Sequence, residues 1–170
     1  MRVSNLENLR TASLLAAVIT MGISAGVYQL YSFVIMPGLS KTDDRTFVGA
    51  FQQIDKAIVG PYLIVFFVGA LVFTALAAVF HVGIEEGTTL LWIVGALVLQ
   101  LVIVATTIVV NVPLNNAIKD AGSPNEIIDL AGVRKRFNER RWINWNHIRV
   151  VTSTIAFVAL AWALVLDGRS

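Results

Sequence analysis

The sequence predicts an all-α fold: a single four-helix transmembrane bundle with an amphipathic helix after the first span and a cytoplasmic helical extension before the fourth. The chain of 170 residues is 56% hydrophobic and only 14% charged, and its mean hydropathy is +0.74. Four uncharged apolar runs reach or approach the length of about 20 residues that a helix needs to cross a bilayer. No repeat or low-complexity stretch divides the chain, so we expect residues 1–170 to form one domain.

The four spans are expected at about residues 11–36, 60–82, 88–112 and 150–166. No Lys, Arg, Asp or Glu interrupts these runs, and each such residue would cost about 2.5–3.5 kcal/mol at the centre of a span. A cleavable signal peptide is the alternative for the first run, because Arg2 and Arg10 precede it. The run is longer than the apolar region of a signal peptide, so we expect a retained span.

Basic residues gather on one side of this topology, in the first loop and around the third. These ten residues are Lys41, Arg45, Lys56, Lys119, Arg134, Lys135, Arg136, Arg140, Arg141 and Arg149. The other side carries Arg2, Arg10 and Arg169, and its loop holds Glu85 and Glu86. The positive-inside rule then places the first and third loops in the cytoplasm and both termini outside a cell membrane that the chain crosses several times.

The first loop is expected to contain an amphipathic helix. After Pro37 and Gly38, Thr42 can cap a helix whose first turn holds Asp43 and Asp44. Apolar residues then recur at helical spacing, at Phe47, Phe51, Ile54 and Ile58. Such a helix either lies at the membrane interface, which is the simpler alternative, or folds over the mouth of the bundle as a lid.

The third loop carries a helix-start signal in Ser123-Pro124-Asn125-Glu126, where a capping hydroxyl is followed by proline and then by Glu at the third position. We expect a helix from this point through the basic stretch into the fourth span, with Gly132 and Asn138 as the candidate breaks.

A polar stripe is predicted on one face of the first span, formed by Thr20, Ser24, Tyr28, Tyr31 and Ser32. Hydroxyl groups in hydrocarbon need partners, so this face should turn toward the bundle interior or a hydrated cavity. Hydrogen bonding between helices without any ligand explains the stripe equally well. Gly22 and Gly26 would allow close approach of another helix, within the bundle or in a homo-oligomer.

Asn111 and Asn115 lie one turn apart at the end of the third span, and Pro113 between them frees a backbone carbonyl. These three residues form a cluster of hydrogen-bonding groups, although helix termination at the interface is an alternative explanation.

Just before the fourth span, Trp142, Trp145, Asn146 and Arg149 share one helical face, while His147 points elsewhere. An interfacial anchor explains the tryptophan and arginine residues. It gives no reason for Asn146 and His147, which suit oriented polar contacts in a binding site.

Composition excludes several classes of function. The chain has no cysteine, which rules out disulfides, thiolate metal sites, iron–sulfur clusters and thiol redox relays. Its two histidines, His81 and His147, are expected at opposite ends of the bundle and cannot share a metal or a haem. No cofactor or metal is therefore expected, and a net charge of +2 gives no reason to expect a nucleic-acid partner.

Four motifs carry a family resemblance over nearly the whole chain. They are Gly26-x-Tyr28-x-x-x-x-Phe33 leading into Met36-Pro37-Gly38-Leu39, then Phe51-Gln52-x-Ile54-Asp55, Asn111-x-Pro113-Leu114-Asn115 and Arg141-Trp142-x-x-Trp145-Asn146-x-x-Arg149. In these motifs the chain resembles the anthrone oxygenase-like family of small four-span membrane proteins, most of which have no assigned function. The resemblance implies a site where the motifs converge. In the fungal polyketide members, it implies cofactor-independent oxygenation of an anthrone to an anthraquinone.

If that chemistry applies, a base removes an acidic C–H proton and the resulting carbanion reacts with oxygen. His147 is the first candidate base, because imidazole titrates near neutral pH, and Asp55 is the second. Asn115, Asn146 and Arg149 could stabilise the enolate-like oxygen. The candidate substrate-binding residues are Tyr28, Gln52, Asn111, Asn115, Trp142, Asn146 and Arg149.

A non-enzymatic alternative stays open, in which the chain binds membrane lipid or a small hydrophobic or aromatic ligand and its basic cap meets anionic headgroups. Ion-coupled transport is a weaker alternative, because no charged residue interrupts a span. Membrane di-iron and bis-histidine haem enzymes are disfavoured, since the spans lack the carboxylates and histidines that such sites need.

Overall fold

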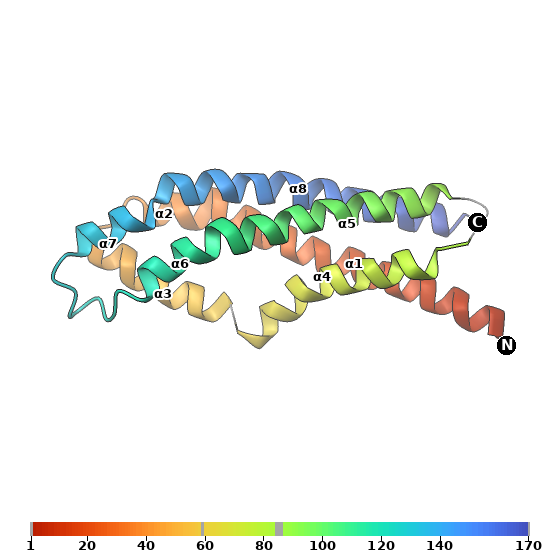
Figure 1. Ribbon diagram of the computed structural model, residues 1–170, viewed down its shortest axis with the longest axis horizontal. Helices are drawn as coiled ribbons and strands as arrows, with labels where there is room; N and C mark the ends of the chain where they lie inside the picture. The colour runs from red at the N-terminus through yellow and green to blue at the C-terminus, as the bar shows by residue number, and fades with distance from the viewer. Residues whose placement is uncertain (1, 59, 84–86, 170) are drawn as a thin grey trace.

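The computed structural model describes residues 2–58, 60–83 and 87–169, and all regular structure in this part of the chain is helical. The elements are α1 (Arg2–Leu30), η1 (Tyr31–Ile35), α2 (Met36–Leu39), α3 (Asp44–Ile58), α4 (Pro61–Phe80), α5 (Thr88–Thr106), η2 (Thr107–Asn111), α6 (Val112–Lys119), α7 (Leu130–Phe137) and α8 (Glu139–Asp167). Figure 1 shows an elongated bundle with both termini toward one end and α3 and α7 at the other, which we call the α3 end.

Four stretches are long and apolar enough to cross a membrane, and they are Leu6–Leu39, Leu63–Phe80, Thr88–Lys119 and Leu130–Asp167. The predicted four-helix transmembrane bundle is confirmed. Three of the helical stretches extend beyond the predicted spans at the α3 end, where a second hydrophobic core packs against them.

Small residues allow the spanning helices to approach closely. α1 packs against α4 and α8, and α5 packs against α8. Their shared core includes five fully buried alanines, Ala17, Ala77, Ala96, Ala156 and Ala163. A Cβ atom at Gly22 would come within 3.0 Å of the Phe157 ring, whereas Gly26 has open space around it. Of the two expected packing glycines, Gly22 therefore makes its contact within the bundle.

Two long helices widen into a π-helical turn near the α3 end, and each turn is followed by a proline. η1 lies just before Pro37, and η2 lies just before Pro113. A proline has no N–H to donate, and its ring clashes with the carbonyl four residues earlier. Those carbonyls belong to Phe33 and Val109, at the middle of the two π-helical turns, so the wider turn relieves the clash. Such turns are frequent at functional sites.

α3 folds over the end of the bundle, so its apolar face packs against the protein. Phe47, Val48 and Phe51 are buried in a second core together with Phe137 and Trp142. The ring centroids of Phe51 and Phe137 are 4.5 Å apart. This packing corresponds to the lid alternative and not to the simpler interfacial one.

The cap of α3 is Asp43, so the prediction of Thr42 was wrong. Asp43 Oδ1 accepts hydrogen bonds from the backbone N–H groups of Arg45 at 3.0 Å and Thr46 at 3.1 Å. Asp43 Oδ2 accepts from the Thr46 hydroxyl at 2.6 Å, while the Thr42 hydroxyl donates to the Leu39 carbonyl. These bonds favour the ionised carboxylate and lower the pKa of Asp43, with the Thr46 hydroxyl as the largest cause.

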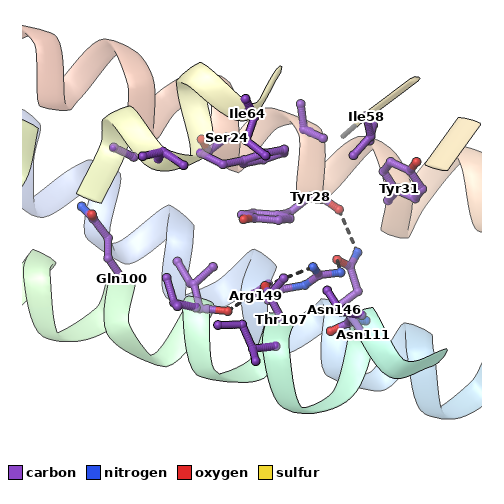
Figure 2. A pocket seen from close by; sticks show the side chains of 18 of the residues that line it. Ser24, Tyr28, Tyr31, Ile58, Ile64, Gln100, Thr107, Asn111, Asn146 and Arg149 are labelled. Carbon is purple, nitrogen blue, oxygen red and sulfur yellow. Dashed lines mark hydrogen bonds between the residues drawn. The ribbon is translucent and has the colours of Figure 1, made fainter. Parts of the chain in front are cut away.

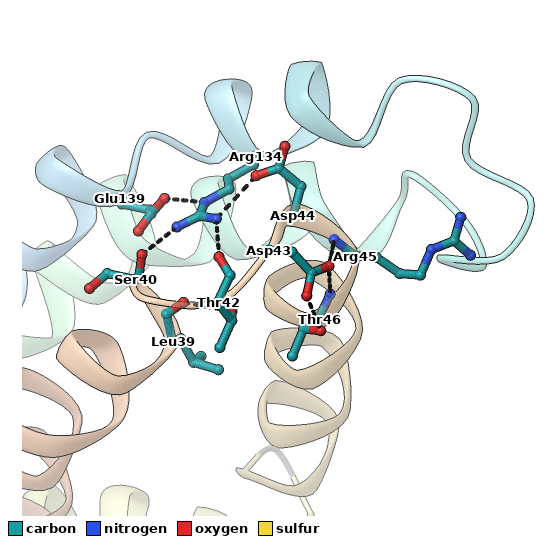
Figure 3. Close-up of polar contacts among 9 residues, drawn as sticks. All are labelled: Leu39, Ser40, Thr42, Asp43, Asp44, Arg45, Thr46, Arg134 and Glu139. Carbon is teal, nitrogen blue, oxygen red and sulfur yellow. Dashed lines mark hydrogen bonds and ion pairs between the residues drawn. The ribbon is translucent and has the colours of Figure 1, made fainter.

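Arg134 fastens α7 to the start of α3, as Figure 3 shows. Its Nη1 donates to the Asp44 carboxylate at 3.0 Å and to the Thr42 carbonyl at 2.9 Å. Its Nη2 donates to the Ser40 carbonyl, and its Nε donates to the Glu139 carboxylate. Arg134, one of the basic residues expected in the cytoplasmic loops, therefore bonds to other residues of the protein.

The helix predicted to start at Ser123 is absent. The Ser123 carbonyl accepts hydrogen bonds from the N–H groups of Glu126 and Ile127, which close a turn. The helix begins instead at Leu130, where the Asp129 side chain accepts from the Gly132 N–H. The sequence signal failed because capping residues also favour turns.

Of the two candidate breaks in this region, the one at Asn138 is confirmed. Asn138 has φ of 54° and separates α7 from α8. Its side chain accepts a hydrogen bond from the Arg141 N–H and so caps α8. Gly132 lies inside α7 and does not interrupt it.

The end of the bundle opposite α3 is closed by a polar contact between α4, α8 and α1. His81 Nδ1 lies 2.6 Å from the Ala77 carbonyl, and His81 Nε2 lies 3.2 Å from Asp167 Oδ1. The Thr11 hydroxyl donates to Asp167 Oδ2 at 2.9 Å. His147 lies in the first part of α8, which follows α7, and its ring is beside Phe33 of η1, so the two histidines are far apart as expected.

Candidate functional site

A cavity of about 420 Å³ lies between α1, α4, α5, η2 and α8, with α3 at one end. Its apolar lining comes mainly from α4, α5 and the η2–α6 region and includes Ile64, Phe67, Val68, Leu71, Ile103, Val104, Ile108 and Val112. Polar and aromatic residues line it toward the α3 end, and they are Tyr28, Tyr31, Asp55, Asn111, Asn115, Trp142, Asn146 and Arg149. The predicted stripe on the first span therefore turns inward, with Ser24, Tyr28 and Tyr31 in the cavity wall (Figure 2).

Arg149 is the buried cation of this cavity. Its side chain is among the buried residues at 6% exposure, although α8 is a membrane-spanning helix. Nη2 donates to Asn146 Oδ1 at 2.7 Å, and Nη1 donates to the Thr107 hydroxyl at 3.4 Å. Nε has no hydrogen-bond partner, and no ion pair in the described part of the chain includes Arg149. Such an uncompensated charge inside a membrane protein points to a function.

Aromatic rings and an amide fix the position of the guanidinium. It lies 4.9 Å from the centroid of the Tyr28 ring and 5.4 Å from that of the Trp142 ring. Asn146 is completely buried, and its Nδ2 donates to the Ser32 hydroxyl at 2.6 Å and to the Tyr28 carbonyl at 3.0 Å. With its amide nitrogen held by α1 and η1, Asn146 presents its oxygen to Arg149 (Figure 2).

Asp55 supplies a carboxylate from the lid. Its Oδ1 accepts from Asn115 Nδ2 at 2.6 Å, and its Oδ2 lies 3.0 Å from Lys119 Nζ. Asn115 Oδ1 in turn accepts from Trp142 Nε1 at 2.7 Å. A continuous polar chain thus links the half-exposed Lys119 to Trp142 through Asp55 and Asn115. Asp55 itself is 4% exposed and is the one carboxylate among the residues that line the cavity.

Asn111 presents an unused acceptor at the same end. Its Nδ2 donates to the Trp142 carbonyl at 3.3 Å, and its Oδ1 has no partner. An unsatisfied buried carbonyl oxygen costs about 1–3 kcal/mol, so this atom favours a ligand that carries a donor.

The structure brings seven of the nine predicted site residues together around the cavity, namely Tyr28, Asp55, Asn111, Asn115, Trp142, Asn146 and Arg149. The other two do not line it. Gln52 donates to the backbone carbonyls of Ile118 and Gly122, so it joins the lid to the end of α6. The exposed His147 faces outward, and its ring centroid is 6.0 Å from that of Phe33. Trp145, at the edge of the predicted helical face, is also exposed at 37%.

Sequence reasoning missed Thr107 and Gln100 as lining residues. Thr107 gives little signal, because threonine is common in membrane helices. Gln100 gives a clear one, since a side-chain amide in an otherwise apolar span needs a partner.

The cavity combines a carboxylate, a guanidinium and an apolar lining, which together can ionise a weakly acidic molecule and hold the resulting anion. No group of three or more His, Cys, Asp or Glu residues suited to a metal ion occurs in the described part of the chain.

Comparison with known proteins gives one family. The sequence model described as Anthrone oxygenase matches residues 47–159, which is more than half of the chain. The matched range begins in α3 and ends in α8, so it includes most of the cavity lining. Searches of curated proteins and of solved structures gave no match.

Proposed function

Because this chain is a multi-pass membrane protein that belongs to the anthrone oxygenase family, we propose that it oxygenates an apolar aromatic ketone inside the cavity. The overall change converts a CH₂ group and O₂ into a carbonyl group and water. No cofactor is needed, because the substrate anion itself supplies the electrons to oxygen. The α3 end is assigned to the cytoplasmic side, on the charge distribution of the loops.

The first step is removal of a C–H proton by Asp55. In an anthrone the electron pair left on carbon is delocalised through the rings onto the carbonyl oxygen, which gains negative charge. The carbon then adds O₂ to form a peroxide. The proton returns to the peroxide and gives a hydroperoxide. Removal of the second proton from the same carbon then forms the carbonyl as the O–O bond breaks, and the departing hydroxide combines with that proton to give water. Asp55 ends the cycle ionised, as it began.

The observation that carries this proposal is the unpaired guanidinium of Arg149, with a free Nε, in the same cavity as Asp55. A guanidinium held in place away from water stabilises a developing oxyanion strongly. The proposal therefore takes Asp55 as the base and Arg149 as the oxyanion-binding residue, with Asn111 and Asn115 as further polar contacts. Asp55 is preferred to His147 because it lines the cavity.

The apolar lining supports a substrate that reaches the cavity from the bilayer. Four lining residues also lie on the outer surface of the bundle, with exposed fractions of 44% for Ile64, 53% for Val68, 62% for Ile108 and 40% for Val112. They belong to α4 and to the η2–α6 region, so the proposal places a lateral entrance for a planar apolar molecule between these helices.

The test uses the protein in lipid nanodiscs with anthrone as the probe, and it follows O₂ consumption and anthraquinone absorbance above the uncatalysed rate. Asp55→Asn keeps the shape of the side chain and removes the base, so kcat should fall by about 100-fold or more. Asp120→Asn, a change of an exposed carboxylate at the same end, is the matched control. His147→Ala should keep at least half of the activity, because this ring faces away from the cavity.

A second candidate function is binding of a small hydrophobic ligand without turnover, which the unsatisfied Asn111 oxygen also favours. Tight binding of anthrone with no rate above background in the wild type would contradict the oxygenase proposal and support this alternative. Full activity in both Asp55→Asn and His147→Ala would show that neither residue is the base.

A further inference from the structure

Gln100 lies in the middle of a membrane-spanning helix and is buried, with 3% of its surface exposed. It lines the cavity toward the end farther from α3, while Arg149, Asn146 and Asn111 lie at the other (Figure 2). Its Nε2 donates to the hydroxyl of Thr74, on α4, at 2.8 Å. This bond joins α5 to α4 and accounts for one half of the side-chain amide.

The hydrogen bonds of Thr74 fix which way the amide points. The single hydroxyl proton of Thr74 is donated to the Ala70 carbonyl at 2.7 Å. The hydroxyl oxygen can therefore only accept from Gln100, which places the NH₂ group against Thr74 and leaves Oε1 on the other side. That oxygen is buried and has no hydrogen-bond partner.

An acceptor left empty at this depth is costly in a bilayer, because no bulk water reaches it. A single hydrogen bond between α4 and α5 would not need an amide, since a serine or threonine hydroxyl on α5 can make it. Gln100 adds a second polar group that the fold does not use. A molecule bound in the cavity could satisfy this oxygen by donating a hydrogen bond to it.

The position of Gln100 sets the length of that molecule. Gln100 precedes Thr107 by two helical turns, which is about 10 Å along the axis, and Thr107 contacts Arg149. The lining between the two levels is apolar, with Ile103 and Val104 on α5 and Leu71 on α4. The cavity thus has a polar group at each end of an apolar passage.

We infer that Gln100 is a specificity-determining residue that accepts a hydrogen bond from a hydroxyl group at the distal end of an elongated aromatic ligand. The ligand class follows from the proposed function, on which this inference rests for its proximal end: an oxygen near Arg149, an apolar ring system, and a hydroxyl near Gln100. A site with a dedicated acceptor rejects the analogue that lacks the donor, because its own polar atom is then left unpaired.

The test compares equilibrium binding of 2-hydroxyanthraquinone and anthraquinone to the full-length protein in nanodiscs, in the absence of turnover. The wild type should bind the hydroxy probe about tenfold more tightly. Gln100→Leu should abolish this preference by weakening the hydroxy probe alone. Thr106→Val, which removes another buried hydroxyl from α5 outside the cavity lining, should keep the preference and serves as the matched control.

Each outcome bears on a different claim. Equal binding of both probes by the wild type, or an unchanged preference in Gln100→Leu, would overturn the role of Gln100 and leave the oxygenase proposal standing. Failure of both probes to bind the wild type would overturn the ligand site as a whole. Thermal unfolding midpoints of the variants show whether Gln100→Leu is folded, and Gln100→Met provides a second apolar replacement with a flexible side chain.

Discussion

At the scale of single residues, much of the site could be predicted because polar side chains stand out in an apolar chain. Asn111, Asn115, Asn146 and Arg149 were recognised from residue type and helical spacing, and all four line the cavity. His147 was chosen for its chemistry, although the same spacing placed it off the face shared by Asn146 and Arg149. The helical period was the better guide, since the orientation of a side chain on a helix follows from its position.

Arg149 should be more important for activity than for stability. Arg149→Met removes the oxyanion-binding group, and kcat on anthrone should fall by about 100-fold. The unfolding midpoint should stay the same or rise, because an unpaired buried charge is replaced by an apolar side chain of similar length. Activity assays and thermal denaturation in detergent measure the two effects. A large loss of stability with normal specific activity would contradict this assignment.

At the scale of secondary-structure elements, the existence of the helices could be predicted but several of their ends could not. The π-helical turns η1 and η2 were not predicted. Each of them precedes a proline that is visible in the sequence, Pro37 for η1 and Pro113 for η2. The cap of α7 lies six residues after the predicted one, at Asp129 and not at Ser123, because the capping motif at Ser123 serves a turn. Local signals identify a cap, and the surrounding packing decides whether a helix follows.

The cap of α3 should make the lid sensitive to acid. The pKa of Asp43 is lower in the folded protein than in the unfolded chain, where it is about 3.9. Its stabilising effect is therefore complete above that value and is lost as the pH falls through the lower, folded pKa. The difference in unfolding midpoint between the wild type and Asp43→Ala should be largest near neutral pH and should shrink as the pH falls below the pKa of the unfolded chain. A difference that does not change with pH would show that the charge of Asp43 has no role in the cap.

At the scale of the whole molecule, the four-span bundle followed from hydropathy, whereas the closure of its end did not. The amphipathic pattern of α3 fits a membrane surface and a protein surface equally well. Its burial depends on Phe137 and Trp142, which lie far along the chain and approach Phe51 only in the folded protein. The cavity is a product of the same long-range packing, because four helices and the lid each contribute part of its wall.

The two glycines of α1 should differ in their effect on the bundle. Gly22→Leu should destabilise the protein by about 1–3 kcal/mol, because the new side chain meets the Phe157 ring on α8. Gly26→Leu introduces the same side chain one turn away into open space and should be nearly neutral. Denaturation of both variants in the same detergent provides the comparison. Equal effects would show that α1 and α8 are not in close contact at Gly22.

The proposed entrance from the bilayer determines which substrate concentration sets the reaction rate. It is lined by the exposed residues Ile64, Val68, Ile108 and Val112. A molecule that enters between α4 and η2 is drawn from a two-dimensional solution, so the quantity that sets the reaction rate is its mole fraction in the lipid. Empty vesicles added at constant total substrate would then slow the reaction, although nothing in the aqueous phase competes with it. The same bilayer that contains the protein would then also supply its substrate.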